Sequence, residues 1–208
     1  MSKLRLGVKR FFDFVGALCG LIILSPVFLI IAILIRLDSK GPVFFTQERL
    51  GKNGKVFNII KFRTMIVNAE NLGEGLRVST EDDPRITKVG KVLRATSLDE
   101  LPQLINVVKG DMSLVGPRPP ATYHPYDGYA NYPEWAKKRF EMRPGITGLA
   151  QVNVRNSVSW NERIEVDNQY VDAFGIWLDA KIILRTFYRI VKPENVYLAN
   201  DSKSENMD

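Results

Sequence analysis

The chain has 208 residues, of which 45% are hydrophobic and 25% are charged. These values are ordinary for a globular protein and exclude a wholly disordered or collagen-like chain, while the single cysteine, Cys19, excludes an internal disulfide. The net charge of +6 at pH 7 indicates a polyanionic partner, which is a nucleic acid, an anionic membrane or a phosphate compound.

The first predicted element is an apolar helical segment near the N-terminus. The 22 uncharged residues from Phe14 to Ile35 would form a straight helix of roughly 33 Å, which is long enough to cross a bilayer. A cleaved signal peptide is disfavoured, because its apolar core would be about 7 to 15 residues long and followed by a small-residue cleavage site. Basic residues crowd both flanks of the run, so the positive-inside rule favours neither orientation of a spanning helix.

Ser25 and Pro26 stand near the middle of this run and predict a bend. Proline removes one helical hydrogen bond, and a serine hydroxyl can help to satisfy the freed carbonyl. A bent segment that enters and leaves on the same cytoplasmic face would satisfy both basic flanks. We therefore favour a re-entrant helix-break-helix hairpin over residues 1–38, with a proline-kinked spanning helix as the alternative.

The remaining chain predicts an α+β domain over residues 39–198, followed by a disordered tail over 199–208. A β-hairpin is expected from the apolar runs Val43 to Phe45 and Val56 to Ile60, which flank a turn at Asn53-Gly54. A polar loop then covers residues 68–83. The later elements, in chain order, are short helices at 87–94 and 98–108, an extended stretch at 112–120, a Gly/Thr turn region at 143–153 and amphipathic helices at 160–174 and 178–191.

The last predicted helix carries a basic stripe beside an apolar face. One interpretation is a helix that packs on the core and exposes its charges to water. The other is an interfacial helix that lies on anionic lipid, for which Trp177 and Tyr188 are suitable rim residues. The stripe consists of Lys181, Arg185, Arg189 and Lys192, and the apolar face of Leu178, Ile182, Ile183, Phe187 and Ile190.

The densest cluster of chemically capable residues surrounds the adjacent carboxylates Asp99 and Glu100, at a predicted helix start. A purely structural interpretation is available, because Ser97 and Glu100 have the spacing of a capping box. Pro102 complicates it: with Ser97 as the cap, Pro102 lies inside the helix, whereas with Asp99 as the cap it lies harmlessly in the first turn. The surrounding cations are Arg85, Lys88, Lys91, Arg94 and Arg118.

This cluster suits phosphoryl transfer. A carboxylate can attack phosphorus as a covalent nucleophile, provided that a metal ion and guanidinium groups neutralise the phosphate oxygens. A neighbouring carboxylate is a natural Mg²⁺ ligand. Arg118 lies among prolines, from Gly116 to Pro120, which restrict the backbone that presents its planar fork. An exposed turn arginine is the structural alternative for Arg118.

Four motifs make the sequence recognisable. KFRTM (61–65), DPRITKVGKVLR (83–94), TSLDELPQLINVVKGDMSLVGPRP (96–119) and RPGITGLAQVN (143–153) resemble, in order and spacing, those of the bacterial sugar transferase family of small monotopic phosphoglycosyl transferases. The resemblance implies transfer of a sugar 1-phosphate from a UDP-sugar to polyprenol phosphate, with release of UMP. It also implies a site on the cytoplasmic face of the bacterial inner membrane, a re-entrant hairpin, Mg²⁺, an aspartyl phosphosugar intermediate and a place as the first membrane step of glycoconjugate synthesis.

The resemblance also implies roles for individual residues. Asp99 matches the nucleophile, Glu100 its metal-binding partner, and Arg118 the phosphate-binding arginine. The positions of Lys61, Arg94 and Arg143 match positively charged family positions, for which we expect substrate binding. In the less family-like stretch 121–142 we expect the only histidine, His124, to be structural or exposed, and we expect Arg155, Asn156 and Ser157 to line the sugar pocket.

Two other classes of function stay open at this level. The first is a membrane-anchored binding module whose basic charge holds nucleic acid or lipid without any chemistry. Nucleic-acid binding would predict a recognised fold signature or basic residues interleaved with stacking aromatics, and the sequence has neither. A noncatalytic scaffold of the same fold would not need the Asp99-Glu100 pair, which is intact. UMP release from a UDP-sugar in the presence of Mg²⁺ separates these classes from the enzyme.

Overall fold

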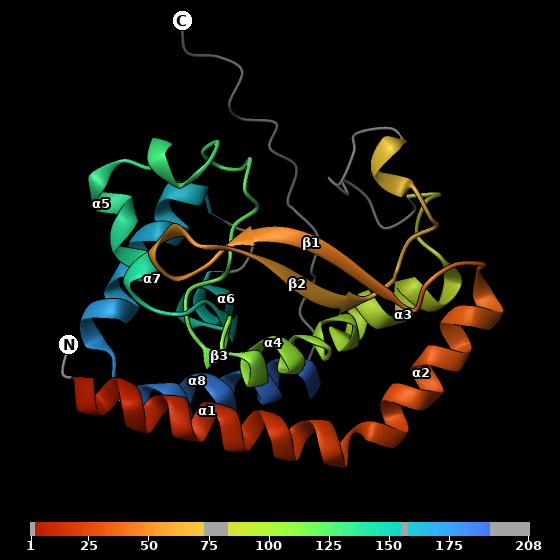
Figure 1. The fold of residues 1–208 in the computed structure, drawn as a ribbon, viewed down its shortest axis with the longest axis horizontal. Coiled ribbons are helices and arrows are strands. Elements are labelled where there is room, and N and C mark those ends of the chain that lie inside the picture. The colour runs from red at the N-terminus through yellow and green to blue at the C-terminus, as the bar shows by residue number, and fades with distance from the viewer. Residues whose placement is uncertain (1–2, 73–82, 155–157, 192–208) are drawn as a thin grey trace, which may run out of the picture.

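The computed structural model describes residues 3–72, 83–154 and 158–191, and shows a mixed α+β fold that is mostly helical (Figure 1). The predicted tail at 199–208 and the predicted pocket lining at 155–157 lie outside these residues. Helix α1 runs along the base and α2 rises from its end, while the hairpin of β1 and β2 crosses above. The bounds are α1 (Lys3–Ile23), α2 (Ser25–Asp38), β1 (Phe44–Leu50), β2 (Val56–Phe62), α3 (Lys88–Thr96), α4 (Gln103–Lys109), β3 (Ser113–Val115), α5 (Glu134–Lys137), β4 (Gly145–Thr147), α6 (Leu149–Asn153), α7 (Trp160–Ala173) and α8 (Ile176–Val191).

The bend between α1 and α2 confirms the role predicted for Ser25 and Pro26. Within the described ranges no single helix is long and apolar enough to cross a membrane. The two helices reach that length and composition only together, as a pair bent by 60°. The break falls at Leu24, so Pro26 lies in the first turn of α2, where its missing N–H is harmless. The hydroxyl of Ser25 donates to the carbonyl of Ile22 at 2.8 Å. In a straight helix that carbonyl would accept from residue 26, which as proline has no N–H to donate.

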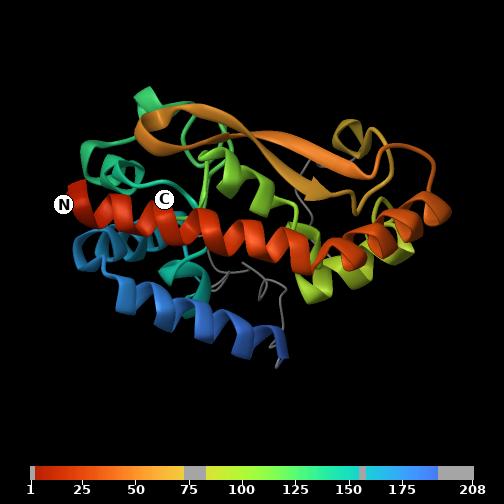
Figure 2. The same ribbon diagram turned by 60° about the horizontal axis from the view of Figure 1, so that its bottom comes forward.

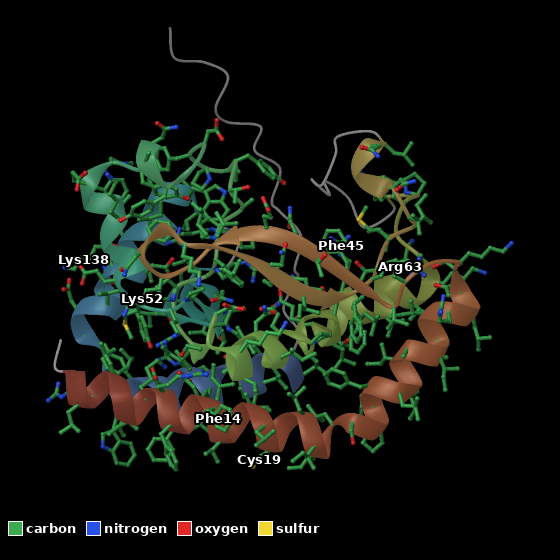
Figure 3. All side chains as sticks on the ribbon, in the orientation of Figure 1. Phe14, Cys19, Phe45, Lys52, Arg63 and Lys138 are labelled. Carbon is green, nitrogen blue, oxygen red and sulfur yellow. The ribbon has the colours of Figure 1, made fainter. Side chains whose placement is uncertain are left out.

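Helix α1 packs closely on the rest of the protein through small residues. A Cβ atom at Gly16 would lie 3.0 Å from Leu114, and one at Gly20 would lie 3.2 Å from Leu104, so a larger side chain at either position would require the leucine to move. Ala17 is fully buried on the same face. Phe14 and Cys19 mark this helix at the base of the molecule in Figure 3. The helix also carries exposed apolar side chains, which include Phe11, Phe12, Val15, Leu18 and Ile22.

A buried polar network joins α1 to the first turn of α8, and the two helices diverge from that end (Figure 2). The ammonium of Lys9 lies 2.6 Å from Asp179 and 3.6 Å from Asp13, and all three side chains are largely buried. Tyr170 donates to the second oxygen of Asp179 at 2.7 Å. Asp13 in turn accepts hydrogen bonds from the hydroxyl of Ser113 and from the backbone N–H of Leu114. The N-terminal helix is therefore attached to the domain by charge as well as by packing.

We expect Lys9→Met to destabilise the protein by about 3 to 5 kcal/mol, because it leaves two buried carboxylates without their cation. The measurement is the thermal unfolding midpoint in detergent. Adding Asp179→Leu to Lys9→Met should recover part of the loss, because it removes one of the two uncompensated charges, while Asp13 keeps its hydrogen bonds from Ser113 and Leu114. A midpoint unchanged by Lys9→Met alone would show that the network does not hold α1 in place.

The β-hairpin is confirmed and is longer than predicted. Strands β1 and β2 pair antiparallel from Phe44 opposite Phe62 to Leu50 opposite Val56. The connection is a 3-10 turn in which Asn53 has φ 56° and Gly54 has φ 75°, a left-handed conformation that favours these residue types. The predicted loop at 68–83 contains a further 3-10 turn, Ala69–Asn71, and its residues 73–82 lie outside the described ranges.

The predicted single helix at 98–108 is wrong. Ser97 has φ 58° and ends α3, residues Leu98–Glu100 form a 3-10 turn, and α4 begins only after Pro102. Neither Ser97 nor Asp99 caps α4, because Pro102 occupies the cap position, with no side-chain cap bond. The left-handed residue and the proline together interrupt the helix, and the carboxylate pair lies in the interruption.

The turn region predicted at 143–153 contains two further elements, β4 and α6. Strand β4 pairs with β3 in parallel, with Ser113 opposite Gly145 and Val115 opposite Thr147. The two strands approach so closely at Gly145 that a Cβ there would lie 2.1 Å from the nitrogen of Gly116. Because the pairing joins segments about thirty residues apart, neighbouring residues carry no periodic signal for it.

Both interpretations of the last helix find support in α8. Ile182 is 1% exposed and packs in the core, as expected for a helix that rests on the domain. Arg185 donates to the side chain of Asn153 in α6. Trp177, however, is 84% exposed, so apolar surface also faces outward. The other exposed apolar residues of α8 are Ile176, Leu184, Phe187 and Tyr188; Lys192 lies outside the described ranges.

Candidate active site

The carboxylate pair lies in the 3-10 turn between α3 and α4, against β2 (Figure 1). The residues on either side of the pair, Leu98 and Leu101, join an apolar cluster with Phe28 and Ile31 of α2. The turn is therefore fastened to the bent helix pair through its apolar residues. This arrangement places the acidic turn against α2, while Glu100 contacts Lys61 and Arg118.

Glu100 joins two of the predicted site residues. The ammonium of Lys61 in β2 donates to its Oε1 at 2.7 Å, and Arg118 donates to the same oxygen at 3.2 Å. Lys61 also lies 3.9 Å from an oxygen of Asp99. The Arg118 side chain is 41% exposed, whereas those of Asp99 and Glu100 are 14% and 20% exposed, so the arginine is on the open side of the group.

The two carboxylates differ electrostatically. Burial raises the pKa of Asp99, and the charge of Glu100 raises it further against the opposing pull of Lys61. Burial acts on Glu100 in the same direction, but Lys61 and Arg118 together outweigh it and lower the pKa of Glu100 to about 2. The charge on Glu100 is thus compensated directly, while Asp99 has no cation closer than Lys61 among the described residues.

The structure brings Arg94 near the pair and places Arg143 elsewhere. Arg94, in the last turn of α3, lowers the pKa of Asp99 through its charge. Its Nη1 is buried and has no hydrogen-bond partner in the described ranges, so this N–H group is available to donate a hydrogen bond near the carboxylates. Arg143 instead donates to the carbonyl of Gly110, beyond the far end of α4, at 2.7 Å. Its part in substrate binding stays a prediction.

His124 and Arg49 complete the surroundings. His124 is exposed and packs edge to face on Trp160, as expected for a residue outside the catalytic group. Arg49 of β1 was not singled out by the sequence, although it donates to the carbonyl of Pro119 at 3.3 Å. Burial, and then the charge of Arg118, lower the pKa of Arg49 to about 10. Its position in an ordinary alternating strand gave no signal of this contact.

The carboxylate pair is the candidate ligand set for the predicted Mg²⁺. In residues 3–72, 83–154 and 158–191 there is no group of three or more His, Cys, Asp or Glu that could hold a metal ion. Mg²⁺ is commonly bound by one or two carboxylates together with substrate phosphates and water. The donors therefore fit a metal that binds with a phosphate substrate. Because Lys61 and Arg118 both bind Oε1 of Glu100, Oε2 is the oxygen that would coordinate.

Known proteins resemble the chain over nearly its whole length. It is 47% identical over 188 residues to a galactosyl transferase, CpsE, of Streptococcus agalactiae, which covers 86% of this chain but only 41% of the relative. A UDP-glucose:undecaprenyl-phosphate glucose-1-phosphate transferase of Caulobacter vibrioides is 43% identical over 194 residues, or 91% of this chain and 72% of that protein. An uncharacterized sugar transferase of Bacillus subtilis, EpsL, is 41% identical, and the match covers 95% of this chain and 94% of EpsL.

The sequence profile of one family, described as bacterial sugar transferase, matches residues 4–193. The matched span contains the bent helix pair, the hairpin and every residue of the acidic site. Lys61, Asp99, Glu100 and Arg118, which the resemblance of motifs singled out, meet at one place in the fold. The chain belongs to the bacterial sugar transferase family.

Proposed function

We propose that this protein transfers a sugar 1-phosphate from a UDP-sugar to undecaprenyl phosphate, releases UMP and thereby starts the synthesis of a polysaccharide. The observation that carries the proposal is the carboxylate pair held between Lys61 and Arg118. Relatives in Caulobacter vibrioides and Klebsiella pneumoniae carry the name UDP-glucose:undecaprenyl-phosphate glucose-1-phosphate transferase, and their identities of 43% and 42% support the same chemistry here.

Asp99 is the better nucleophile of the two carboxylates. Glu100 is bonded to two cations through Oε1, which withdraws electron density and holds it in place. Within the described residues the one ion pair of Asp99 is the contact of 3.9 Å with Lys61, so its oxygens remain available for attack. Glu100 is therefore the group that organises the cations, and Asp99 is the group that reacts.

The reaction proceeds in two displacements. An Asp99 oxygen attacks the sugar-bearing phosphorus, the bond from that phosphorus to the bridging oxygen breaks, and UMP leaves with the bridging oxygen. An oxygen of the lipid phosphate then attacks the same phosphorus and releases the Asp99 carboxylate. Lys61, Arg94 and Arg118 supply positive charge to the phosphate oxygens. Bound Mg²⁺, held by Glu100, would neutralise further charge on the diphosphate. Neither displacement requires a proton from the enzyme, in agreement with the position of His124.

The test is UMP release by the purified protein from a panel of UDP-sugars with Mg²⁺ and undecaprenyl phosphate. We expect release to depend on the sugar and to be accompanied by a lipid diphosphate sugar. A noncatalytic binding module or scaffold would release no UMP from any member of the panel, and that result would overturn the proposal.

The same proposal includes a monotopic membrane position. Exposed apolar residues on α1, α2 and α8 provide the surface, and the bent pair is too sharply turned to behave as one straight span. The basic residues of α8, including Lys181, suit anionic headgroups. We propose that α1 and α2 form a re-entrant hairpin whose two ends both lie on the cytoplasmic side.

Cysteine labelling tests this topology. In a Cys19→Ser background, Ser2→Cys and Lys40→Cys should both resist a membrane-impermeant thiol reagent in intact cells and react after the inner membrane is opened. Labelling of residue 2 in intact cells would contradict the hairpin. Pro26→Ala should restore the helical hydrogen bond to the carbonyl of Ile22 and shift part of the population toward a form in which the segment spans the membrane.

Glu100→Gln should raise the Mg²⁺ concentration needed for half-maximal activity and lower turnover even at saturating UDP-sugar. Glutamine lacks the charge that binds both the metal and the two cations, and hydrogen bonds to charged groups contribute about 1.5 to 3 kcal/mol. The measurement is a Mg²⁺ titration of UMP release. Glu134→Gln, which changes an exposed glutamate that bonds Lys137, is the control and should leave the titration unchanged. An unchanged profile in Glu100→Gln would remove Glu100 from the metal site.

A further inference from the structure

The backbone that carries Arg118 is held in place by donors from other parts of the chain. Three successive carbonyl groups, those of residues 118 to 120, each accept a hydrogen bond from outside the segment. Two of these three residues are prolines, which have no N–H with which to hold themselves. The bonds run from Arg139 Nη2 to Arg118 (2.6 Å), from Arg49 Nη1 to Pro119 (3.3 Å) and from the backbone N–H of Leu50 to Pro120 (3.0 Å).

Arg139 is the most deeply buried of these donors. Its side chain is 1% exposed, and the same Nη2 that donates to the Arg118 carbonyl also lies 2.7 Å from Asp167 of α7, whose side chain is 2% exposed. Arg139 belongs to a 3-10 segment, Lys138–Glu141, that packs on α7. One nitrogen thus links α7 to the backbone of the residue that bonds Glu100.

Stability alone does not account for this buried pair. Nε and Nη1 of Arg139 and Oδ1 of Asp167 have no hydrogen-bond partner in the described ranges. Burial raises the pKa of Asp167 to about 6 against the pull of Arg139, so burying the charge of Asp167 is unfavourable. Buried ion pairs of this kind are often no more stabilising than apolar side chains of similar volume. What the pair does supply is a fixed position for the Arg118 carbonyl.

We propose that Arg139 and Asp167 are positioning residues for the transfer reaction: Asp167 orients Arg139, and Arg139 holds the backbone of Arg118 so that its guanidinium meets Glu100 and the diphosphate. This inference rests on the proposed function of Arg118. It assigns a role in the reaction to two residues that touch neither carboxylate of the acidic pair. A pair that serves folding alone makes the opposite predictions in the experiments that follow.

The decisive variant replaces the pair with apolar residues, Arg139→Met with Asp167→Leu. We expect its thermal midpoint to stay near or above that of the unchanged enzyme, because both charges of the buried pair are removed together. Its kcat should fall on the order of tenfold to a hundredfold, as for a small misplacement of a catalytic group, with a smaller change in KM. Arg139→Lys, which keeps the charge on a shorter side chain, should lose kcat in the same direction. A stable variant with unchanged kcat would overturn the proposal.

The matched control is a neighbouring ion pair between the same two elements. Lys138 lies 2.5 Å from Asp172, and both side chains are partly exposed. Figure 3 shows Lys138 at the edge of the molecule. Lys138→Met with Asp172→Leu removes this pair without touching a donor to the Arg118 segment. We expect its kcat and KM to equal those of the unchanged enzyme.

Two further measurements test action through Arg118. In an Arg118→Ala background, the apolar exchange at 139 and 167 should reduce kcat by less than twofold, whereas independent multiplication of the two losses would overturn the proposal. A spin label at Arg118→Cys, in a Cys19→Ser background, should become more mobile on the apolar exchange and not on the control exchange. Label mobility is read without turnover. If the unchanged enzyme releases no UMP, the proposed function is refuted. If the apolar exchange leaves the label spectrum as it was, the positioning role is refuted.

Discussion

Asp99→Asn should abolish turnover while the protein keeps its fold. Asparagine has the size of aspartate but no negative charge, and an amide cannot form the acyl phosphate on which the two displacements depend. In the part of the chain that the structure describes, the nearest cation to Asp99 is Lys61 at 3.9 Å, so little binding energy is lost with its charge. Steady-state UMP release measures the rate, and the thermal unfolding midpoint serves as the control on folding.

The unchanged enzyme should also release UMP from the UDP-sugar in the absence of lipid, in an amount equal to the enzyme present. Covalent catalysis requires this burst, since the sugar phosphate stays on Asp99 until an acceptor arrives. With both substrates varied, double-reciprocal plots should be parallel. A missing burst together with intersecting plots would show direct transfer through a ternary complex, and Asp99 would then not be a covalent nucleophile.

Arg118→Lys should lose on the order of 2 to 4 kcal/mol of transition-state stabilisation, equivalent to roughly a 30-fold to 1000-fold drop in kcat. Lysine keeps the charge but lacks the planar fork that donates to Glu100 Oε1 and that we propose also binds phosphate oxygens. The comparison is kcat and KM for UMP release. Arg36→Lys, at an exposed arginine that donates to the Gly41 carbonyl, should have no effect. Full activity in Arg118→Lys would mean that the residue is an ordinary surface arginine.

The sequence predicted those features that depend on neighbours in the chain. The bend follows from Pro26, which lacks an N–H, and from Ser25, which supplies a hydroxyl to the carbonyl that proline leaves unbonded. The hairpin follows from Asn53 and Gly54, which adopt the left-handed conformation of its turn. The same local reasoning failed at 98–108. Ser97 and Asp99 were competing candidates for the helix cap, and neither of them caps α4 in the structure.

The site divides in the same way. Adjacent carboxylates and an arginine flanked by prolines were visible in the sequence as motifs, so Asp99, Glu100 and Arg118 could be named as candidates. The meeting of Lys61 with Glu100 joins residues 39 positions apart, and that of Arg139 with Asp167 joins residues 28 apart. These contacts depend on the path of the whole chain, which residue types and spacing do not encode locally. By itself the sequence determined which groups are available for the chemistry; the tertiary structure decided which of them lie together, because burial and non-local packing set the distances over which charges and hydrogen bonds act.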